Sequence, residues 1–126
     1  MSPEDVPQPY ALRYRPRAIR DIDTESVRLA DAEGDEIALD WLQKLRVAIG
    51  SLSTWPRRFA LASEENLIER RVRVMLFRRT PGGATWRVFY TVEDASEDGF
   101  VVHIRHIRHA ASPLTDQDTG ELLTDA

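Results

Sequence analysis

The spacing of apolar residues changes once along this chain, and that change limits the folds it can adopt. Between residues 16 and 55, apolar side chains recur every three or four positions, which is the period of an amphipathic helix. From residue 67 to residue 109 the period is two, which indicates strands with one buried face. Helical segments followed by a run of strands favour an α+β fold, in which helices cover one face of a sheet.

The helical part divides at a glycine. A first helix is predicted to begin at Pro16, because proline suits the first turn, and to end at Gly34. A second helix is predicted from about Asp35 to the pair Trp55–Pro56, since the residue before a proline avoids the helical region. Two amphipathic helices joined by a short turn make an antiparallel hairpin with one apolar face.

Four segments have the alternation of strands. One precedes the first helix, at "YALRYRP", and three follow the second, at "VRVMLF", "WRVFYTV" and "VVHIRHIRH". The predicted order β-α-α-β-β-β makes a two-layer α+β domain, with the helix hairpin packed on one face of a mainly antiparallel sheet. We assign this domain to residues 9–114. Residues 1–8 are then an N-terminal extension, and residues 115–126 an acidic tail expected to be frayed, or to form a short helix on binding.

Strict alternation predicts which side chains face the helices and which face away. Val72, Val74, Val88 and Ile104 are expected beneath the helices. The opposite, open face then receives the cationic or titratable residues Arg71, Arg73, Arg87, His103, Arg105 and His109. The alternative is a solvated face whose arginines only limit aggregation. His106 and Arg108 fall on the helix side, unless a β-bulge near the strand end changes the register.

The three histidines, at intervals of three, raise the question of a metal site. In a strand His103 and His109 share one face while His106 points through the other, so they cannot meet at one ion. The chain has no cysteine and no HExxH pair that would supply further ligands. We therefore predict no metal and no cofactor.

Charge is spread unevenly over the 126 residues, whose net charge is −4. Residues 68–112 hold eight basic and five acidic residues, whereas residues 113–126 hold four acidic residues and none that are basic. This predicts a local basic surface within an acidic protein. No apolar run has the length of a membrane span, and the absence of cysteine suits a reducing compartment. A cytoplasmic protein with no membrane partner is expected.

Several segments together resemble the RelE/ParE superfamily, the toxins of type II toxin–antitoxin modules. They are "YALRYRPRAIRDID", "ALDWLQKLRVAIGSLSTWPRR", "VRVMLF", "WRVFYTV" and "VVHIRHIRHAASPL", and they span about residues 9 to 114. The ending "IRHAA" is close to the family's "IRHGAR". The resemblance implies a compact toxin that a cognate protein antitoxin neutralises by folding a C-terminal segment across its surface.

The resemblance leaves the target open, because one fold carries two activities. RelE-like toxins cut mRNA at the ribosome without a metal, whereas ParE-like toxins poison DNA gyrase. We favour a ribonuclease, with a gyrase inhibitor or a catalytically inert binding relative as alternatives. Ser112 stands where RelE-like toxins have an arginine, no tyrosine follows it, and the second strand lacks a lysine base.

The resemblance also implies roles for individual residues. By position, Arg71 and Arg73 resemble the basic pair of the family's second strand, and Arg87 resembles the arginine of its "YR" strand. His109 is the best candidate proton carrier, since histidine titrates near neutrality. The predicted catalytic residues are thus Arg71, Arg73, Arg87 and His109. The predicted substrate-binding residues are His103, Arg105 and Arg108.

Overall fold

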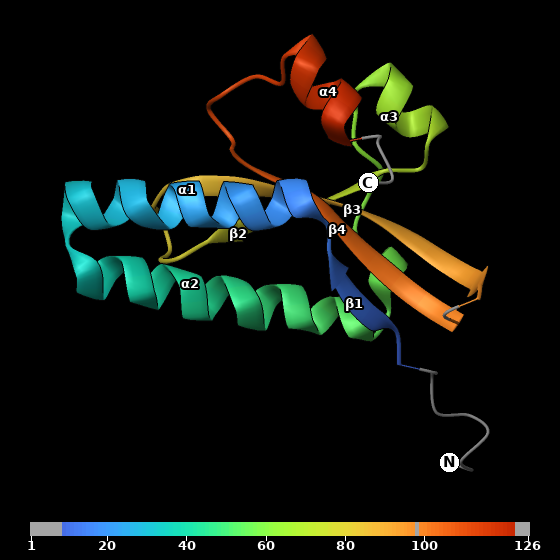
Figure 1. Ribbon diagram of the computed structural model, residues 1–126, viewed down its shortest axis with the longest axis horizontal. Coiled ribbons are helices and arrows are strands. Elements are labelled where there is room, and N and C mark those ends of the chain that lie inside the picture. Colours follow the sequence, from blue (N-terminus) through green and yellow to red (C-terminus); the bar gives the residue numbers. More distant parts are fainter. Residues whose placement is uncertain (1–8, 98, 123–126) are drawn as a thin grey trace.

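A four-stranded mixed sheet and a helix hairpin form the body of the molecule. The computed structural model describes residues 9–97 and 99–122. Its main elements are β1 (Ala11–Tyr14), α1 (Pro16–Glu33), α2 (Asp35–Gly50), β2 (Arg73–Arg78), β3 (Thr85–Ser96) and β4 (Gly99–His109). The strands lie in the order β1-β4-β3-β2, with β1 parallel to β4 and the other neighbours antiparallel (Figure 1). The predicted α+β class and element order are confirmed.

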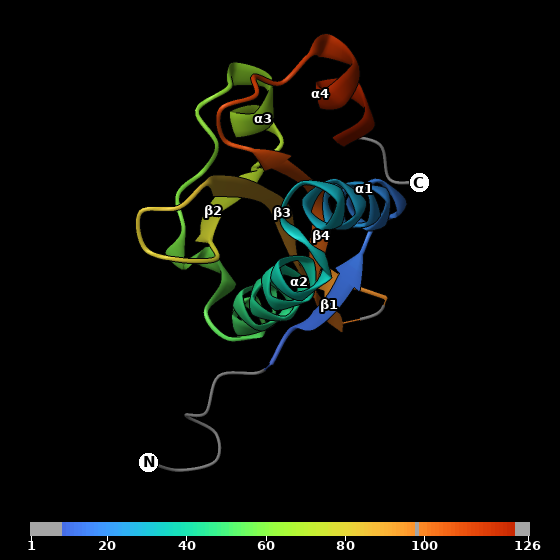
Figure 2. The ribbon, with the colours of Figure 1, turned by 90° about the vertical axis from the view of Figure 1, so that its left-hand side faces the viewer.

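Shorter helical pieces fill the connections. Two 3-10 turns, η2 (Ser51–Ser53) and η3 (Pro56–Arg58), follow α2. Helix α3 (Glu65–Glu69) precedes β2, and α4 (Asp116–Leu122) follows β4. Figure 2 shows α3 and α4 on one side of the sheet and α2 on the other. None of the helices in residues 9–97 and 99–122 is both long enough and apolar enough to span a membrane.

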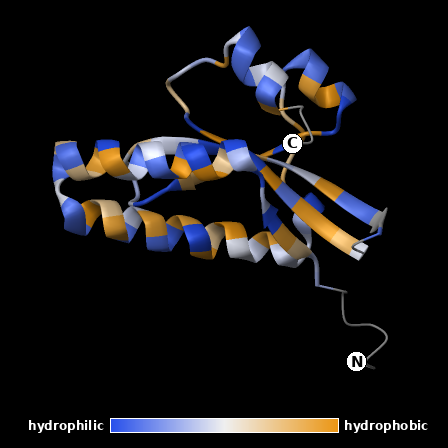
Figure 3. Cartoon of the chain, in the orientation of Figure 1, coloured by the Kyte–Doolittle hydropathy of each residue, from blue (hydrophilic) through white to orange (hydrophobic). Residues whose placement is uncertain are grey.

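The helix boundaries follow the predicted signals. Helix α1 begins at Pro16 and is closed by Gly34, whose φ of 98° lies in the region that favours glycine. Helix α2 ends at Gly50, earlier than predicted, because the chain tightens into 3-10 turns before Trp55. Figure 3 shows apolar and polar residues interleaved along both helices, as amphipathic helices require.

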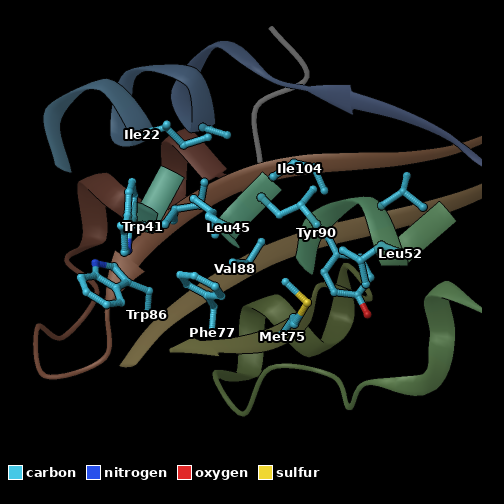
Figure 4. Close-up of a cluster of buried hydrophobic side chains, with 14 of the residues drawn as sticks. Ile22, Trp41, Leu45, Leu52, Met75, Phe77, Trp86, Val88, Tyr90 and Ile104 are labelled. Carbon is cyan, nitrogen blue, oxygen red and sulfur yellow. The ribbon is translucent and has the colours of Figure 1, made fainter. Parts of the chain in front are cut away.

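The main core lies between the helix hairpin and the sheet. Trp41 of α2 packs against Trp86 of β3, with ring centroids 5.5 Å apart, and against Phe77 of β2 at 6.4 Å. Val88 and Ile104 lie in the same cluster with no exposed surface, as predicted (Figure 4). Aromatic contacts of this kind add about 0.5–1.5 kcal/mol each beyond the area they bury. This core holds the sheet and both helices as one unit.

Strand β2 presents the opposite face from the one predicted. Met75 and Phe77 enter the main core, whereas Leu76 is 64% exposed. Val72 and Val74, predicted beneath the helices, pack instead into a second cluster on the other side of the sheet. Both faces of this segment carry apolar residues. The larger side chains, Met75 and Phe77, fill the space in the core that also holds Trp41 and Trp86.

A second apolar cluster covers part of the sheet face that was predicted to be open. It consists of Ala62, Leu67, Val72, Phe89 and Leu122, with Val74 and Leu114 packed against it. Leu67 belongs to α3 and Leu122 to α4, so both short helices dock on this face (Figure 1). Within the segment expected to be frayed, residues 116–122 form a docked helix, with Leu122 only 1% exposed, and residues 123–126 lie outside the described residues.

A β-bulge in β4 resets the alternation of its last residues. Phe89 pairs with His106 and Tyr90 with Ile104, so Arg105 is the extra residue of the bulge. After the bulge, Ile107 enters the main core and His109 lies on the helix side. Strict alternation had placed His109 on the open face, and that prediction is wrong. The β-bulge that was named as the possible exception to strict alternation is present.

Candidate functional site

Two of the four predicted catalytic residues lie off the predicted face at the start of β2. Arg71 precedes the strand in a turn, with a left-handed φ of 56°, and is exposed. Arg73 pairs with Tyr90, which belongs to the main core, and so lies on the helix side of the sheet. Its Nη1 donates hydrogen bonds to the carbonyl oxygens of Phe59 at 2.7 Å and Arg57 at 3.2 Å. These hydrogen bonds hold the loop after α2 against the start of β2.

Arg87 alone of the predicted catalytic arginines lies where alternation placed it, on the face away from the hairpin. Its Nη2 donates to Oε1 of Glu64, and the guanidinium lies 4.6 Å from the ring centre of Phe89. Burial alone would raise the pKa of Glu64, but Arg87 holds it below the ordinary value. The charge of Arg87 is thus already neutralised by a neighbouring carboxylate.

His109 lies on the helix side because of the bulge. Its ring meets Trp86 edge-on, with centroids 5.5 Å apart, and its Nδ1 accepts a hydrogen bond from the backbone N–H of Ala111 at 3.1 Å. Arg73 and His109 pair with Tyr90 and Trp86, which are separated by about 13 Å along β3 at 3.3 Å per residue. The predicted convergence of the four residues on one face is wrong.

The predicted substrate-binding residues are also engaged with neighbours. His103 contacts Oε1 of Glu93 at 3.0 Å, and Nε of Arg105 donates to the hydroxyl of Thr91 at 2.8 Å. Arg108 forms an ion pair with Asp118 of α4 at 2.9 Å. The first two lie along the middle of β4, whereas Arg108 belongs to a cavity at its end.

That cavity, of about 600 Å³, lies between α1, the end of β4 and α4. Figure 2 shows the three elements together, with α4 beside the upper part of the sheet and near α1. One stripe of α1 lines it, because residues three and four apart share a helix face. The lining residues are Arg17, Arg20, Asp21, Thr24, Glu25, His106, Ile107, Arg108, His109, Ser112, Gln117, Asp118 and Glu121.

Asp21 is the centre of the cavity wall. Its carboxylate accepts hydrogen bonds from the backbone N–H of Ile107 at 3.0 Å and from Nε of Arg17 at 2.8 Å, and it contacts Nδ1 of His106. Burial would raise the pKa of Asp21, but these partners, first His106, hold it below the ordinary value. The carboxylate therefore stays charged and joins α1 to β4.

His106 is almost completely buried, at 1% exposure, and stacks on Phe89 with ring centroids 5.6 Å apart. One ring nitrogen is used by Asp21, whereas Nε2 has no hydrogen-bond partner among the described residues. A buried polar atom without a partner is uncommon and destabilising, so its presence calls for an explanation. His106 combines this atom with a carboxylate that fixes its ring.

Two carboxylates of α4 meet three arginines at this cavity. Asp118 pairs with Arg17 at 2.8 Å and with Arg108 at 2.9 Å. Glu121 pairs with Arg20 at 2.8 Å and also contacts Nη1 of Arg17. Burial would raise the pKa of Asp118, but hydrogen bonds from Thr115 and Arg17, together with the charge of Arg108, hold it well below its ordinary value. The helix is therefore held by charge as well as by Leu122.

Chemically, the cavity is a cluster of arginines whose charges are balanced by carboxylates of the same chain. Within the ranges that the structure describes, no group of three or more His, Cys, Asp or Glu residues is placed to hold a metal ion. The cations come from two elements, and two of the carboxylates come from a third. Sequence reasoning missed Arg17, Arg20 and Asp21, although their spacing on one face of the predicted helix was a usable signal.

Comparison with known proteins identifies the family. Residues 12–113 match the sequence profile described as "ParE toxin of type II toxin-antitoxin system, parDE". The chain belongs to the ParE toxin family. A ParE toxin is one half of a two-protein module, so its partner is an antitoxin. No curated protein matches this ParE-family sequence.

A solved structure has the same fold as this ParE-family chain. It is the chromosomal ParDE TA system from P. aeruginosa, at 18% sequence identity and a TM-score of 0.61. The match covers 82% of this chain and 98% of the other. At that identity the similarity supports the RelE/ParE-like fold, and the function must be argued from the residues of this chain.

Proposed function

We propose that this chain is a cytoplasmic toxin that arrests DNA gyrase by binding to it, and that a cognate antitoxin neutralises it. One observation carries the choice between gyrase and mRNA. The residues expected to form a cleavage site lie in separate environments, and Arg73, Arg87 and His109 each have a partner within the chain.

Cleavage of RNA by its own 2′-hydroxyl requires a base, an acid and cations within hydrogen-bond reach of one phosphate. Arg73 and His109 are separated by about 13 Å along β3 alone, and Arg87 points through the opposite face. Arginine is a poor proton carrier because it is ionised far above neutral pH. Inhibition by binding needs only a surface of the right shape and charge, so the geometry favours it.

The family resemblance supports the same choice. ParE-like members of the superfamily poison gyrase, and the sequence profile that matches residues 12–113 is that of ParE toxins. The departures from the RelE pattern, with Ser112 in place of an arginine and no lysine base on β2, also favour a toxin that does not cut RNA.

Two purified assays test the proposal. The toxin, separated from its antitoxin, is titrated into a gyrase supercoiling reaction and into a ribosome-programmed mRNA cleavage reaction. We expect supercoiling to stop at stoichiometric toxin and the mRNA to stay intact, and the antitoxin to reverse the effect. Cleaved mRNA with normal supercoiling would establish the ribonuclease instead. A folded chain inactive in both assays would indicate an inert binding relative.

Cell growth provides an independent check. Induction of this chain alone should stop growth, and co-expression of the antitoxin should restore it. Plasmid DNA isolated after induction should be relaxed, because gyrase maintains negative supercoiling. Arrest with unchanged plasmid topology would contradict gyrase as the target.

A further inference from the structure

We propose that Arg17, Arg20 and Arg108 form a binding site for the phosphates of DNA, which the carboxylates of α4 occupy within the same chain. The choice of DNA rests on the proposed function, since gyrase acts on a DNA substrate. The site itself rests on the cavity between α1, β4 and α4, which includes Arg108 and His109 of the predicted site but none of the predicted catalytic arginines.

The three arginines converge from two elements. Arg17 and Arg20 lie one turn apart on α1, and Arg108 follows the bulge in β4. The three nitrogens of Arg17 contact three carboxylates, with Nε on Asp21, Nη2 on Asp118 and Nη1 on Glu121. A guanidinium binds phosphate oxygens with the same fork geometry that it uses for carboxylates.

Removing α4 would leave the site positively charged. Glu121 is the carboxylate paired with Arg20, and Asp118 the one paired with Arg108, in the part of the chain that the structure describes. Asp21 would stay with His106 and Arg17, and it cannot neutralise the other two arginines from its hydrogen-bonded position.

The other acid in the cavity wall, Glu25, is also committed elsewhere. It pairs with Arg28 at 2.8 Å and accepts a hydrogen bond from the indole N–H of Trp86 at 3.0 Å. The carboxylates of α4 are thus the ones that neutralise Arg20 and Arg108, and an incoming anion would take their place.

Helix α4 is short and weakly held, so a competing anion can displace it from the three arginines. It spans seven residues, Asp116–Leu122, whereas an isolated helix in water needs about 12–15 to be stable. Gly120 lies within it and weakens it further. Leu122 is its one buried apolar side chain, so much of its attachment comes from ion pairs that salt or a competing anion weakens.

The lining favours phosphates over an acidic peptide. Of the thirteen residues around the cavity, Ile107 is the one apolar member, so a peptide helix would find little to cover its apolar face. Thr24 and Ser112 supply hydroxyl groups, and His106 supplies a ring nitrogen without a partner among the described residues. A polar wall with forked cations suits a hydrated, repeating phosphate chain.

The test uses full-length chains and a fluorescent 20-base-pair duplex, with binding followed by anisotropy over a range of NaCl. The double variant Asp118→Asn/Glu121→Gln should bind at least tenfold more tightly than the wild type at low salt. Its affinity should fall with salt at a log–log slope of about −2.7, the value for three phosphate contacts. Adding Arg20→Gln or Arg108→Gln to it should lower the slope by about one each.

A matched control separates the site from simple charge. Asp31→Asn/Glu33→Gln changes the net charge equally at the far end of α1, where both residues are exposed, and should leave binding unchanged. The proposal is overturned if the α4 variant binds no more tightly than the wild type, or if the control gains as much. It is also overturned if polyglutamate competes as well as DNA, which would indicate an acidic-peptide site.

The binding assay contains no gyrase, so the two proposals fail separately. If the α4 variant binds DNA more tightly but supercoiling stays normal at high toxin concentration, gyrase is rejected as the target and the phosphate site is supported. If the toxin inhibits supercoiling but the α4 variant binds DNA no more tightly than the wild type, the proposed function is supported and this site is rejected. Circular dichroism of every variant establishes that it is folded.

Discussion

The carboxylate of Asp21 accepts a hydrogen bond from the backbone N–H of Ile107, 3.0 Å away. This contact joins α1 to β4 beyond the last pair of β1 with β4, Tyr14 with Ile104, where no strand of the described part of the chain pairs with that edge. The same carboxylate binds the ring of His106, so one acid on α1 fixes the strand just after its bulge. The geometry of the cavity depends on this contact.

Asp21→Ala should therefore destabilise the fold. It leaves the N–H of Ile107 and the ring of His106 without an acceptor, and a buried donor left unpaired costs about 1–3 kcal/mol. Urea unfolding followed by tryptophan fluorescence measures the change. Asp23→Ala, at an exposed position two residues away, should shift the free energy of unfolding by less than about 0.5 kcal/mol. Equal effects of the two substitutions would contradict this role.

The environments of His106 and His109 in β4 predict different consequences of replacing them. His106 is buried between Phe89 and Asp21, whereas His109 is partly exposed. His106→Ala should lower the free energy of unfolding by about 1–3 kcal/mol, and His109→Ala by clearly less. The same urea titration compares them. A larger loss for His109 would contradict the burial of His106 between Phe89 and Asp21.

The docking of α4 should weaken in acid. The folded-state pKa of Asp118 lies below its ordinary value of 3.8, so its stabilising effect is complete above that value and is lost as pH falls below it. NMR shifts of α4 residues should report a helix at pH 7 and lose helical character progressively as the pH falls below 3.8. Asp116→Asn, at an exposed position in the same helix, should leave this transition in place, whereas Asp118→Asn should undock α4 already at pH 7. A pH-independent α4 would contradict the ion-pair account.

The sequence was sufficient for α1 and for the helix-facing side of β3, because each of these patterns allows one interpretation. Pro16 and Gly34 bound α1 by local backbone preferences, which need no tertiary contact. In β3 the apolar set Trp86, Val88 and Tyr90 is clearly larger than the set opposite, so the face that packs against the helix hairpin is unambiguous. Local rules are enough where a single period fits the segment.

The candidate site could not be predicted in the same way. Both faces of β2 carry apolar residues. Phe77 lies in the main core because it packs against Trp41, which is far away in sequence. No local signal marks Arg105 as the bulge. The α4 contacts join Arg17 to Asp118 across 101 positions, and the acidic composition of that segment alone indicated a solvated tail.

The most direct test of the central claim is the activity of the double variant Arg87→Ala/His109→Ala. If the toxin acts by binding gyrase through no catalytic group, this variant should inhibit supercoiling within about twofold of the wild type, because neither residue takes part in chemistry. Removing an acid–base group and a charge stabiliser from a nuclease typically lowers the rate about a hundredfold or more. Purified wild type and variant, both verified as folded, are titrated side by side against gyrase and against ribosome-bound mRNA. Full inhibition of gyrase by both proteins, with intact mRNA, is the predicted result. Loss of toxicity in the variant, together with loss of mRNA cleavage shown by the wild type, would contradict it.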